Sequence, residues 1–441
     1  MNSFKTNKTQ SDELVEIEIA KLNKFGLGSL KKVTPNYGLC FIDVPYTLPG
    51  EISLININNY KKTLIEGSLV KLKTYSTDRI KPICKHFAKC GGCLIQHLDF
   101  KKYLDWKFNL IFNPISKISP QTKFDKIFCT ENFTRRRAKV FVKKEKNKFF
   151  IGFKHFRSNK IADISQCIIL DSKILKVINS INELLEKILD NGDELVLHLN
   201  KLDAGIDILI ETKIKFNFQQ LSFLTKWSLS NNVVRISLKK NSNQFELIGL
   251  FDKLSLNLLN SNLYMLPPPG GFFQATKFAE EILVNSILKY LSIQKKYKII
   301  ELFSGAGTIT LPLLKNKHKL YAFDLNENSI NSLVKAAKEQ NLYNNLQTSI
   351  ENLIKNPIEP NFLNSFDAVI IDPPRSGARN QFLKLAKSKV KLIISISCDT
   401  QSFVSDTRVL LENGYKLKFL IPIDQFLYTH HLEIIGFFEK A

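Results

Sequence analysis

The sequence predicts an α/β protein whose C-terminal part is a doubly wound parallel sheet, preceded by a small all-β barrel and an α+β central segment. From residue 273 onward, short apolar strands alternate with amphipathic helices, which is typical of a doubly wound sheet. Short strands separated by glycines fill residues 13–76, as in a small barrel. A chain of 441 residues has room for two or three domains. The expected boundaries are a disordered tail at 1–12, the barrel at 13–76, the central domain at 77–265 and the C-terminal domain at 266–441.

The elements of the first two domains follow from alternating patterns and turn residues. In the barrel, strands are expected at 14–20, 38–44, 51–57 and 67–74, with Gly26, Gly28 and Gly50 at turns. The central domain shows basic strands at 139–142 and 149–153 and one long helical stretch at 172–189. Its topology does not follow from the pattern.

The C-terminal domain has the clearest alternation. In chain order we expect helix 277–291, strand 297–303, a glycine loop with a further helix, strand 320–323, helix 327–340, strand 366–371, helix 379–388, strand 390–397 and a hairpin-like pair at 417–421 and 432–438.

Charge indicates the class of partner. Sixty-three Lys and Arg residues against 41 acids give a net charge of +22, which favours a polyanionic partner. A generally lysine-rich composition is the alternative explanation of this surplus. Residues 133–160, however, cluster eleven cations with Glu145 as the only acid, and phenylalanines interleave with them at positions 133, 149, 150, 153 and 156. Cations for phosphates beside rings for stacking suit an unpaired RNA segment.

The location expected from the sequence is the cytoplasm. No apolar run reaches the roughly 18 residues that a membrane span needs, so no membrane partner is expected. The polar residues 1–12 lack the apolar core of a secretory signal.

A nucleotide-type ligand is indicated by a glycine loop at the end of the first strand of the C-terminal sheet. Gly305 and Gly307 lie where this strand gives way to a helix, so the backbone can approach a ligand closely. Asp324 closes the next strand and can accept the hydroxyls of a ribose. Asp372, followed by two prolines, ends a later strand; an ordinary turn after a buried strand is the alternative reading.

A candidate nucleophile stands at the end of the following strand. Cys398 lies in a polar Ser-Cys-Asp exit next to the strand that ends at Asp372. A buried thiol acting as a small hydrophobe is the alternative. A thiolate that adds to carbon 6 of uracil would make carbon 5 nucleophilic, which is covalent catalysis. Glu433 is the candidate base for the carbon-5 proton, unless it is a surface acid on an edge strand.

Three of the seven cysteines have the spacing of metal ligands. Cys84, Cys90 and Cys93 fall within ten residues, and no signal peptide supports a disulfide framework. By spacing alone, zinc or an iron–sulfur cluster is possible, and zinc is the commoner structural ion. Cys40 and Cys129 read as ordinary thiols.

Taken together, these motifs resemble the RNA uracil-5 methyltransferases, in particular the iron–sulfur-containing branch that acts on 23S ribosomal RNA. The resemblance runs from about residue 13 to the end, through the cysteine segment 84–97, the segment 163–167, the basic segment 133–138 and the residues around Cys398 and Glu433. It implies a Rossmann-like S-adenosylmethionine-dependent domain, a TRAM-type (OB-like) RNA-binding barrel and an iron–sulfur central domain. The chain departs from the family pattern at Ser304, Thr276 and Asp324 and after Cys398.

The resemblance assigns site residues position by position. It makes Cys398 the nucleophile and Glu433 the general base, and it implies S-adenosylmethionine contacts at Gln274, Phe303, Thr308, Asp324, Asn352 and Asp372. It implies a structural [4Fe-4S] cluster on Cys84, Cys90, Cys93 and Cys167. RNA contacts are expected at Arg135, Arg136, Arg137, Lys139, Lys154 and Arg157. The expected activity is C5-methylation of a uridine in 23S rRNA by a monomer without an obligate protein partner.

Two other functions remain open at this point. One keeps the reaction and changes the substrate to tRNA; the cysteine segment argues against it, because the tRNA branch lacks the cluster. The other is a non-catalytic RNA-binding assembly factor with a vestigial donor site, which would bind RNA without binding the methyl donor.

Overall fold

A computed structural model describes residues 14–34, 38–61, 63–240, 244–259, 261–291 and 295–440. The tail expected at 1–12 lies outside these residues. The chain divides into two compact units: the described residues up to Lys107 together with Tyr428–His430, and Phe108–Leu427 together with the C-terminal residues from His431. Within the described ranges, no helix has the combination of length and apolar character that a membrane crossing needs.

The first unit is built on a six-stranded sheet, so the all-β character expected for this part is confirmed. Its strands are β1 (Leu14–Glu18), β2 (Lys21–Leu22), β3 (Gly28–Thr34), β4 (Gly38–Val44), β5 (Ile52–Lys61) and β6 (Leu64–Leu72), in the order β1-β5-β6-β4-β3-β2. Alternating residues such as Ile17, Ile42 and Ile55 form its core. Gly26 and Gly50 turn the chain at φ values of 77° and 79°, a region that favours glycine. The helix α1 (Phe100–Ile118) follows.

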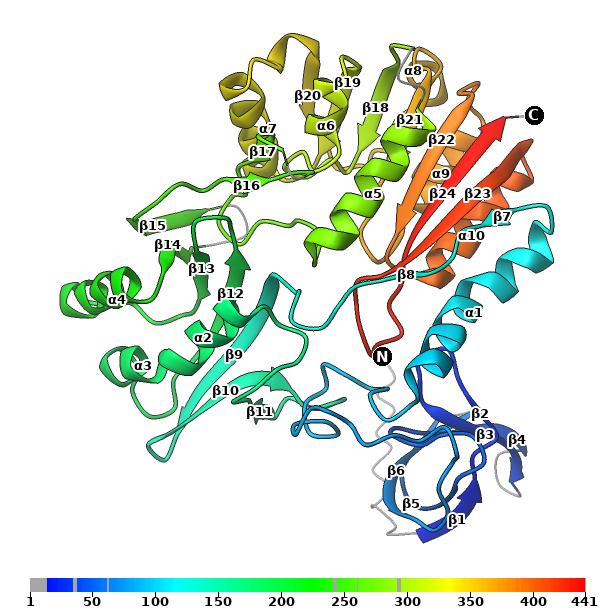
Figure 1. Ribbon diagram of the computed structural model, residues 1–441, viewed down its shortest axis with the longest axis vertical. Helices are drawn as coiled ribbons and strands as arrows, with labels where there is room; N and C mark the ends of the chain where they lie inside the picture. Colours follow the sequence, from blue (N-terminus) through cyan, green and yellow to red (C-terminus); the bar gives the residue numbers. More distant parts are fainter. Residues whose placement is uncertain are drawn as a thin grey trace, which may run out of the picture. The chain divides into compact units, whose positions relative to one another are not determined.

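The second unit contains two large sheets, seen in Figure 1. The central one has seven strands in the order β11-β10-β9-β12-β13-β14-β15. These strands are β9 (Arg137–Glu145), β10 (Lys148–Lys154), β11 (Ile161–Asp163), β12 (Glu194–Lys201), β13 (Ile206–Glu211), β14 (Val233–Lys239) and β15 (Phe245–Leu250). Neighbours pair antiparallel except β13 and β14.

Helices cover one face of this central sheet. α2 (Ser172–Ser180), α3 (Asn182–Ile188) and α4 (Phe218–Ser230) pack on it through residues such as Val177, Leu185 and Trp227. Strand alternation sends Val140 and Val142 of β9 into this core, and therefore turns Lys139 and Phe141 to the opposite face. The helix expected at 172–189 is two helices, interrupted at Ile181.

The C-terminal sheet has the doubly wound arrangement that the sequence predicted. Its strands run in the order β20-β19-β18-β21-β22-β24-β23-β7, and β8 also pairs with β23. They are β18 (Lys298–Leu302), β19 (Lys319–Asp324), β20 (Leu346–Ile350), β21 (Ala368–Ile371), β22 (Leu392–Ser397), β23 (Tyr415–Asp424) and β24 (Glu433–Lys440), joined by the short β7 (Lys123–Phe124) and β8 (Phe128–Cys129). Strands β18 to β22 pair parallel, whereas β24 is antiparallel to both β22 and β23.

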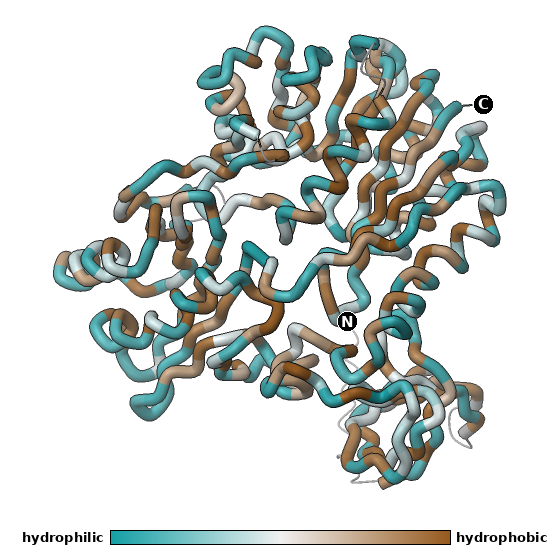
Figure 2. Tube along the Cα trace, viewed as in Figure 1, coloured by the Kyte–Doolittle hydropathy of each residue, from teal (hydrophilic) through white to brown (hydrophobic). Residues whose placement is uncertain are grey.

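Helices bury both faces of this sheet. On one face, α5 (Lys277–Tyr290), α6 (Thr310–Lys315) and α7 (Glu327–Glu339) pack on residues such as Ile299 and Ile370. On the other, α8 (Pro360–Leu363), α9 (Arg379–Ala386) and α10 (Thr400–Leu411) pack on their neighbours Ile300 and Ile371. Strands buried on both sides must be apolar throughout, and the sheet is accordingly brown along its strands in Figure 2.

The remaining elements are short. A two-stranded ribbon of β16 (Leu256–Asn257) and β17 (Tyr264–Met265) precedes α5, and the 3₁₀ turn η1 (Tyr343–Asn345) leads into β20.

Candidate functional site

The carboxyl ends of the central parallel strands form the candidate site. Strand order reverses at β18, which pairs with β19 on one side and with β21 on the other. In open α/β sheets, ligands bind at such a switch point, outside the strand ends. The segments that leave β18, β19, β21 and β22 therefore share one edge of the sheet. A residue that the sequence singled out lies at each of these strand ends: Phe303, Asp324, Asp372 and Cys398.

The loop after β18 has a strained, glycine-dependent backbone. Phe303 adopts φ 65°, which is unusual for a bulky residue, and Gly305 and Gly307 have φ values of 56° and 97°. At Gly307 the positive φ would strain any other residue, and a Cβ would also lie 2.5 Å from Leu333 Cδ1. Ser304 Oγ is buried and has no hydrogen-bond partner within the described structure. A backbone kept open by glycines, with an orphaned hydroxyl beside it, suits a bound ligand.

Asp324, at the end of β19, holds this loop in place. Its Oδ2 accepts the Gly305 N–H at 2.8 Å, and its Oδ1 accepts the Asn326 N–H at 2.7 Å. Each carboxylate oxygen retains a further lone pair for a ligand hydroxyl. The residue after β20 is hydrogen-bonded to Asp324, because the Glu351 N–H donates to the Asp324 carbonyl at 2.9 Å. This bond places the next residue, Asn352, beside Asp324. Thr308 Oγ1, on the far side of the loop, contacts Met265 Sδ at 3.6 Å.

Cys398 occupies the turn between β22 and α10. It follows Ser397 directly and is partly buried. Asp399 caps α10, and its Oδ1 accepts the N–H groups of Gln401 and Ser402 at 3.0 and 2.9 Å. The Asp399 carboxylate thus satisfies the first free amides of α10.

Glu433 reaches the same edge from the opposite chain direction. It is the first residue of β24, whose Ile434 pairs with Ser397 of β22. Because the two strands are antiparallel, the beginning of β24 lies beside the carboxyl end of β22. Glu433 is only 3% exposed, and β24 lies between β22 and β23. The alternative of a surface acid on an edge strand is therefore wrong.

Three carboxyl groups at or near these strand ends have strongly raised pKa values: those of Glu433, Asp372 and Glu301. Burial, and secondarily Asp372, raises the pKa of Glu433 to about 8. Burial, and secondarily Asp324, raises the pKa of Asp372 to about 7. Glu301, buried beneath the loop, has its pKa raised to about 8 by burial, although Thr310 Oγ1 donates to it at 2.7 Å. A positive charge nearby would stabilise the ionised forms of these carboxyl groups, so the cluster favours a cationic ligand.

The thiol of Cys398 is kept neutral by the same surroundings. Burial, followed by the charges of Glu433, Asp372 and Asp399, raises its pKa to about 12. These influences place the thiol, Asp372 and Glu433 within electrostatic reach of one another. A thiolate there needs positive charge nearby, and the ligand that the acidic cluster favours would supply it.

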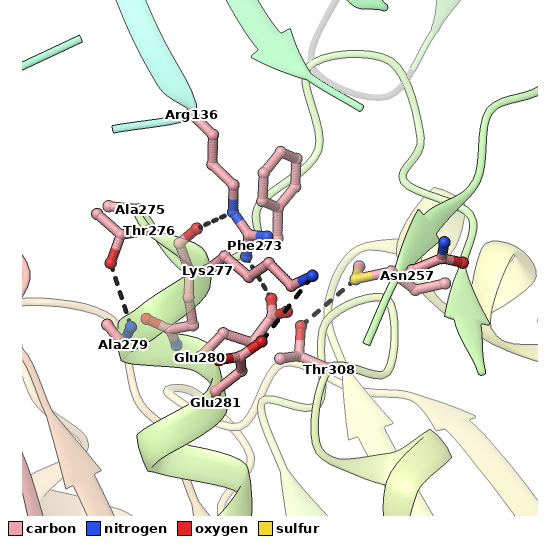
Figure 3. Close-up of polar contacts among 12 residues, drawn as sticks. Arg136, Asn257, Phe273, Ala275, Thr276, Lys277, Ala279, Glu280, Glu281 and Thr308 are labelled. Atoms are coloured by element: carbon pink, nitrogen blue, oxygen red, sulfur yellow. Dashed lines mark hydrogen bonds and ion pairs between the residues drawn. The ribbon is translucent and has the colours of Figure 1, made fainter. Parts of the chain in front are cut away.

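Gln274 joins this edge from the segment before α5. Its Oε1 accepts an N–H from Gln425 Nε2 at 2.7 Å. Thr276 caps α5, and its Oγ1 accepts the Ala279 N–H at 3.2 Å. Arg136 holds the segment from the other side: its Nε donates to the Gln274 carbonyl at 3.1 Å and its Nη2 to Glu280 Oε2 at 2.5 Å (Figure 3).

The three consecutive arginines predicted to contact RNA differ in environment. Arg136 is 5% exposed and paired with Glu280, so its charge is used inside the protein and it is a poor candidate for RNA contact. Arg137 donates from Nη1 to the Phe273 carbonyl at 2.8 Å and lies over the Phe272 ring. Burial, then Arg135 and Arg136, lowers the pKa of Arg137 to about 9, and a nearby phosphate would favour its charged form.

The other predicted RNA contacts lie on or near the helix-free face of the central sheet. Lys139 is exposed, and both its Nζ and that of Lys154 lie over the Phe141 ring, at 5.7 and 4.8 Å. Arg157 is exposed beside Phe156, with its guanidinium 5.0 Å from the ring centroid. Cations and rings side by side suit both phosphates and unstacked bases.

The cysteine segment lies in the irregular loop between β6 and α1. Cys84, Cys90 and Cys93 are partly buried, as is Cys167 after β11. Both Cys90 and Cys93 contribute, after burial, to the raised pKa of Tyr46, so two thiols lie near this phenol. The donor atoms are of the right kind for zinc or iron. Nevertheless, across the residues that the structure describes, no three Cys, His, Asp or Glu side chains are gathered as a metal site requires.

Comparison with known proteins identifies the family. The family described as tRNA (uracil-5-)-methyltransferase matches residues 107–441. An uncharacterized RNA methyltransferase of Brucella suis biovar 1 is 29% identical, over 91% of this chain and 93% of its own. A 23S rRNA (uracil(1939)-C(5))-methyltransferase, RlmD, of Shewanella woodyi is 27% identical over 99% of both chains.

A solved structure shares the fold over almost the whole length. The Pyrococcus abyssi tRNA (uracil-54, C5)-methyltransferase, in complex with S-adenosyl-L-homocysteine, superposes with a TM-score of 0.72 at 21% identity, covering 96% of this chain and 99% of the other. The family match covers the entire C-terminal sheet and its strand-end residues. The chain belongs to the RNA uracil-5-methyltransferase family, which takes its methyl group from S-adenosylmethionine.

Proposed function

We propose that this protein transfers a methyl group to carbon 5 of a specific uridine in 23S ribosomal RNA, with Cys398 as covalent nucleophile and Glu433 as general base. The observation that carries the proposal is the meeting of a thiol and two carboxyl groups at three neighbouring strand ends. Cys398 follows β22, Asp372 follows β21, and Glu433 opens β24, which pairs with β22.

Each group has one task in the reaction. The Cys398 thiol loses its proton to solvent, and its sulfur bonds to carbon 6 of uracil, which turns the ring into an enolate. When bound, S-adenosylmethionine supplies an electrophilic methyl group to carbon 5 of that enolate. Glu433 then takes the carbon-5 proton, the carbon 5–carbon 6 double bond re-forms, and the carbon–sulfur bond breaks to release the thiolate.

The methyl-donor contacts are proposed at the residues that surround the strand ends. Phe303 and Thr308 flank the glycine loop, Asp324 fixes it, and Asn352 follows the neighbouring strand β20. Asp372, near the thiol, and Gln274, hydrogen-bonded to Gln425, complete the set. The acidic environment matches a sulfonium cation, and the orphaned Ser304 hydroxyl adds a further polar group to the loop.

The 23S rRNA substrate is proposed from the relatives and from the surface. Full-length relatives from two Shewanella species carry that activity in their names. RNA contacts are proposed at Arg135, Arg137, Lys139, Lys154 and Arg157; Arg137 has no acidic partner within the described residues, so its charge is available to a phosphate. A monomeric, cytoplasmic enzyme with a TRAM-type N-terminal domain fits this substrate and stays a prediction.

Methylation of RNA transcripts tests the function. We expect purified protein with radiolabelled S-adenosylmethionine to label a 23S rRNA transcript and not a tRNA transcript of the same organism. Nuclease digestion and mass spectrometry should locate the label in 5-methyluridine.

The alternatives give different outcomes in this assay. Label in tRNA alone would assign the protein to tRNA modification. RNA binding without calorimetric binding of S-adenosylmethionine would indicate the non-catalytic assembly factor and overturn the proposal.

The iron–sulfur cluster is a further proposal, supported by the sequence pattern and by the chemistry of the donors. Four thiolates, from Cys84, Cys90, Cys93 and Cys167, suit a structural four-iron cluster. No step of the methyl transfer uses it.

Metal analysis tests this proposal independently of activity. Protein purified without oxygen is expected to contain about four irons and four sulfides per chain and to absorb visible light. Cys90→Ser should lose most of that iron and absorbance, whereas Cys129→Ser, which changes another partly buried thiol, should keep both. A content of one zinc per chain without sulfide would show that the site holds zinc and not an iron–sulfur cluster.

A further inference from the structure

Gln425 links the two sides of the candidate site through a single amide. It follows β23 directly and is 2% exposed. Its Nε2 donates to Glu433 Oε2 at 2.7 Å and also to Gln274 Oε1 at 2.7 Å. Its Oε1 accepts the main-chain N–H of Ala275 at 2.9 Å. Both amide hydrogens are thus in use.

The backbone fixes the orientation of this amide. In the reversed orientation, the NH₂ group would face the N–H of Ala275, and the carbonyl oxygen would face the carboxylate of Glu433. Two donors would then oppose each other, and so would two acceptors. Gln425 is therefore held with its N–H toward Glu433, and Gln274 must present its carbonyl oxygen to Gln425.

The donated hydrogen bond opposes everything else that acts on Glu433. Burial and the facing Asp372 favour the neutral acid, and the Cys398 thiol across the same edge would add a like charge once ionised. The Gln425 N–H is the contact that favours the carboxylate. A carboxyl group must be ionised to accept a proton as a general base. The hydrogen bond from Gln425 therefore stabilises the form of Glu433 that the reaction needs.

We propose that Gln425 is a positioning residue that favours the ionised form of Glu433, fixes the direction of its carboxylate, and couples it to the donor-side residue Gln274. The inference rests on the proposed roles of Glu433 as base and Gln274 as donor contact. Gln425 touches no reacting atom. It joins two side chains, of Gln274 and Glu433, that are 159 residues apart in the chain.

The test replaces Gln425 with leucine, which keeps the size but removes the donor. The pKa of Glu433 is expected to rise by about one unit in Gln425→Leu. The release of methylated RNA from the enzyme should therefore slow about tenfold at pH 7 and recover as the pH is raised past 9. The dissociation constant for S-adenosylmethionine should increase about two- to tenfold, because Gln274 loses its partner.

A second buried glutamine provides the matched control. Gln381 is fully buried, and its amide makes two hydrogen bonds to the main chain of Ile358, at 2.8 and 3.2 Å. Gln381→Leu should lose a comparable amount of stability without moving the pH profile. If both variants slow release equally at every pH, Gln425 has only a structural role.

A direct titration separates this inference from the proposed function. The carboxyl signal of Glu433 can be followed by carbon-13 NMR and assigned by its absence in Glu433→Gln. A raised pKa in Gln425→Leu supports the positioning role even if the wild-type protein methylates no RNA tested. An unchanged pKa would overturn that role even if methylation by the wild-type protein is established.

Discussion

Cys398→Ala is expected to abolish methyl transfer, with a loss on the order of 10⁴-fold or more, as found when a covalent nucleophile is removed. Without the sulfur, uracil carbon 5 stays a poor nucleophile, and neither donor binding nor RNA binding can compensate. The measurement is transfer of labelled methyl to 23S rRNA in single-turnover conditions. Binding of S-adenosylmethionine should persist, because Asp324 and the glycine loop are unchanged.

The matched control is Cys129→Ala. Cys129 is another partly buried thiol of the same unit, at the end of β8, and its loss should leave transfer near the wild-type rate. Methyl transfer by Cys398→Ala at even a tenth of that rate would exclude covalent catalysis by this residue.

The raised pKa of the Cys398 thiol leads to a separate expectation about its rate of alkylation. In the protein without ligand, the pKa of Cys398 is near 12, so alkylation by iodoacetamide should accelerate about tenfold per pH unit well beyond pH 9. Ordinary thiols level off near their own pKa, about 8.5. Asp372→Asn should make Cys398 react faster at a given pH, because it removes one of the charges that disfavour the thiolate.

Residues at strand ends were predictable because topology fixes their location. A parallel sheet brings all its carboxyl ends to one edge, so a polar residue directly after a buried apolar run must lie there. Asp372 and Cys398 follow such runs, β21 and β22, and needed no knowledge of distant contacts. Strand β18 and the glycine loop after it were predictable for the same reason, because an apolar run followed by glycines is recognised without knowledge of distant contacts.

Contacts set by tertiary pairing could not be predicted in this way. The three arginines 135–137 look equivalent in the sequence, yet Arg136 is buried because it meets Glu280 of α5, 144 residues further along. The pairing of Gln425 with Gln274 spans 151 residues. Neither partner carries a local signal, since a buried polar residue is recognised only by what satisfies it.

Local element boundaries failed for a different reason. Residues 172–189 were predicted as one helix because Ile174, Val177, Ile181, Leu184 and Ile188 keep a single apolar face across the interruption. The missed helix α10 did carry a signal, since Asp399 is a typical N-cap residue.

Glu433→Gln is expected to trap the enzyme on its RNA. The amide is nearly isosteric with the carboxyl group but cannot take the carbon-5 proton, so the sulfur–carbon 6 bond formed by Cys398 persists after methyl transfer. A complex of protein and RNA that survives denaturing electrophoresis should accumulate, and turnover should fall by about 10² to 10⁴-fold. Cys398→Ala combined with Glu433→Gln should form no such complex.

Another acid of β24 serves as the control for charge. Glu439, near the far end of the strand, is exposed and accepts a hydrogen bond from Tyr290 Oη at 2.9 Å. Glu439→Gln should turn over normally and leave no stable adduct.

The pH dependence of release gives an independent check on the same residue. The pKa of Glu433 is raised to about 8 by burial and by Asp372, so the active carboxylate is depleted as the pH falls through that value. Release by the wild-type enzyme should therefore slow by about tenfold per pH unit below 8, and Glu433→Gln should lose this dependence. Rapid release by Glu433→Gln with the same pH dependence as the wild type would assign the proton to another group.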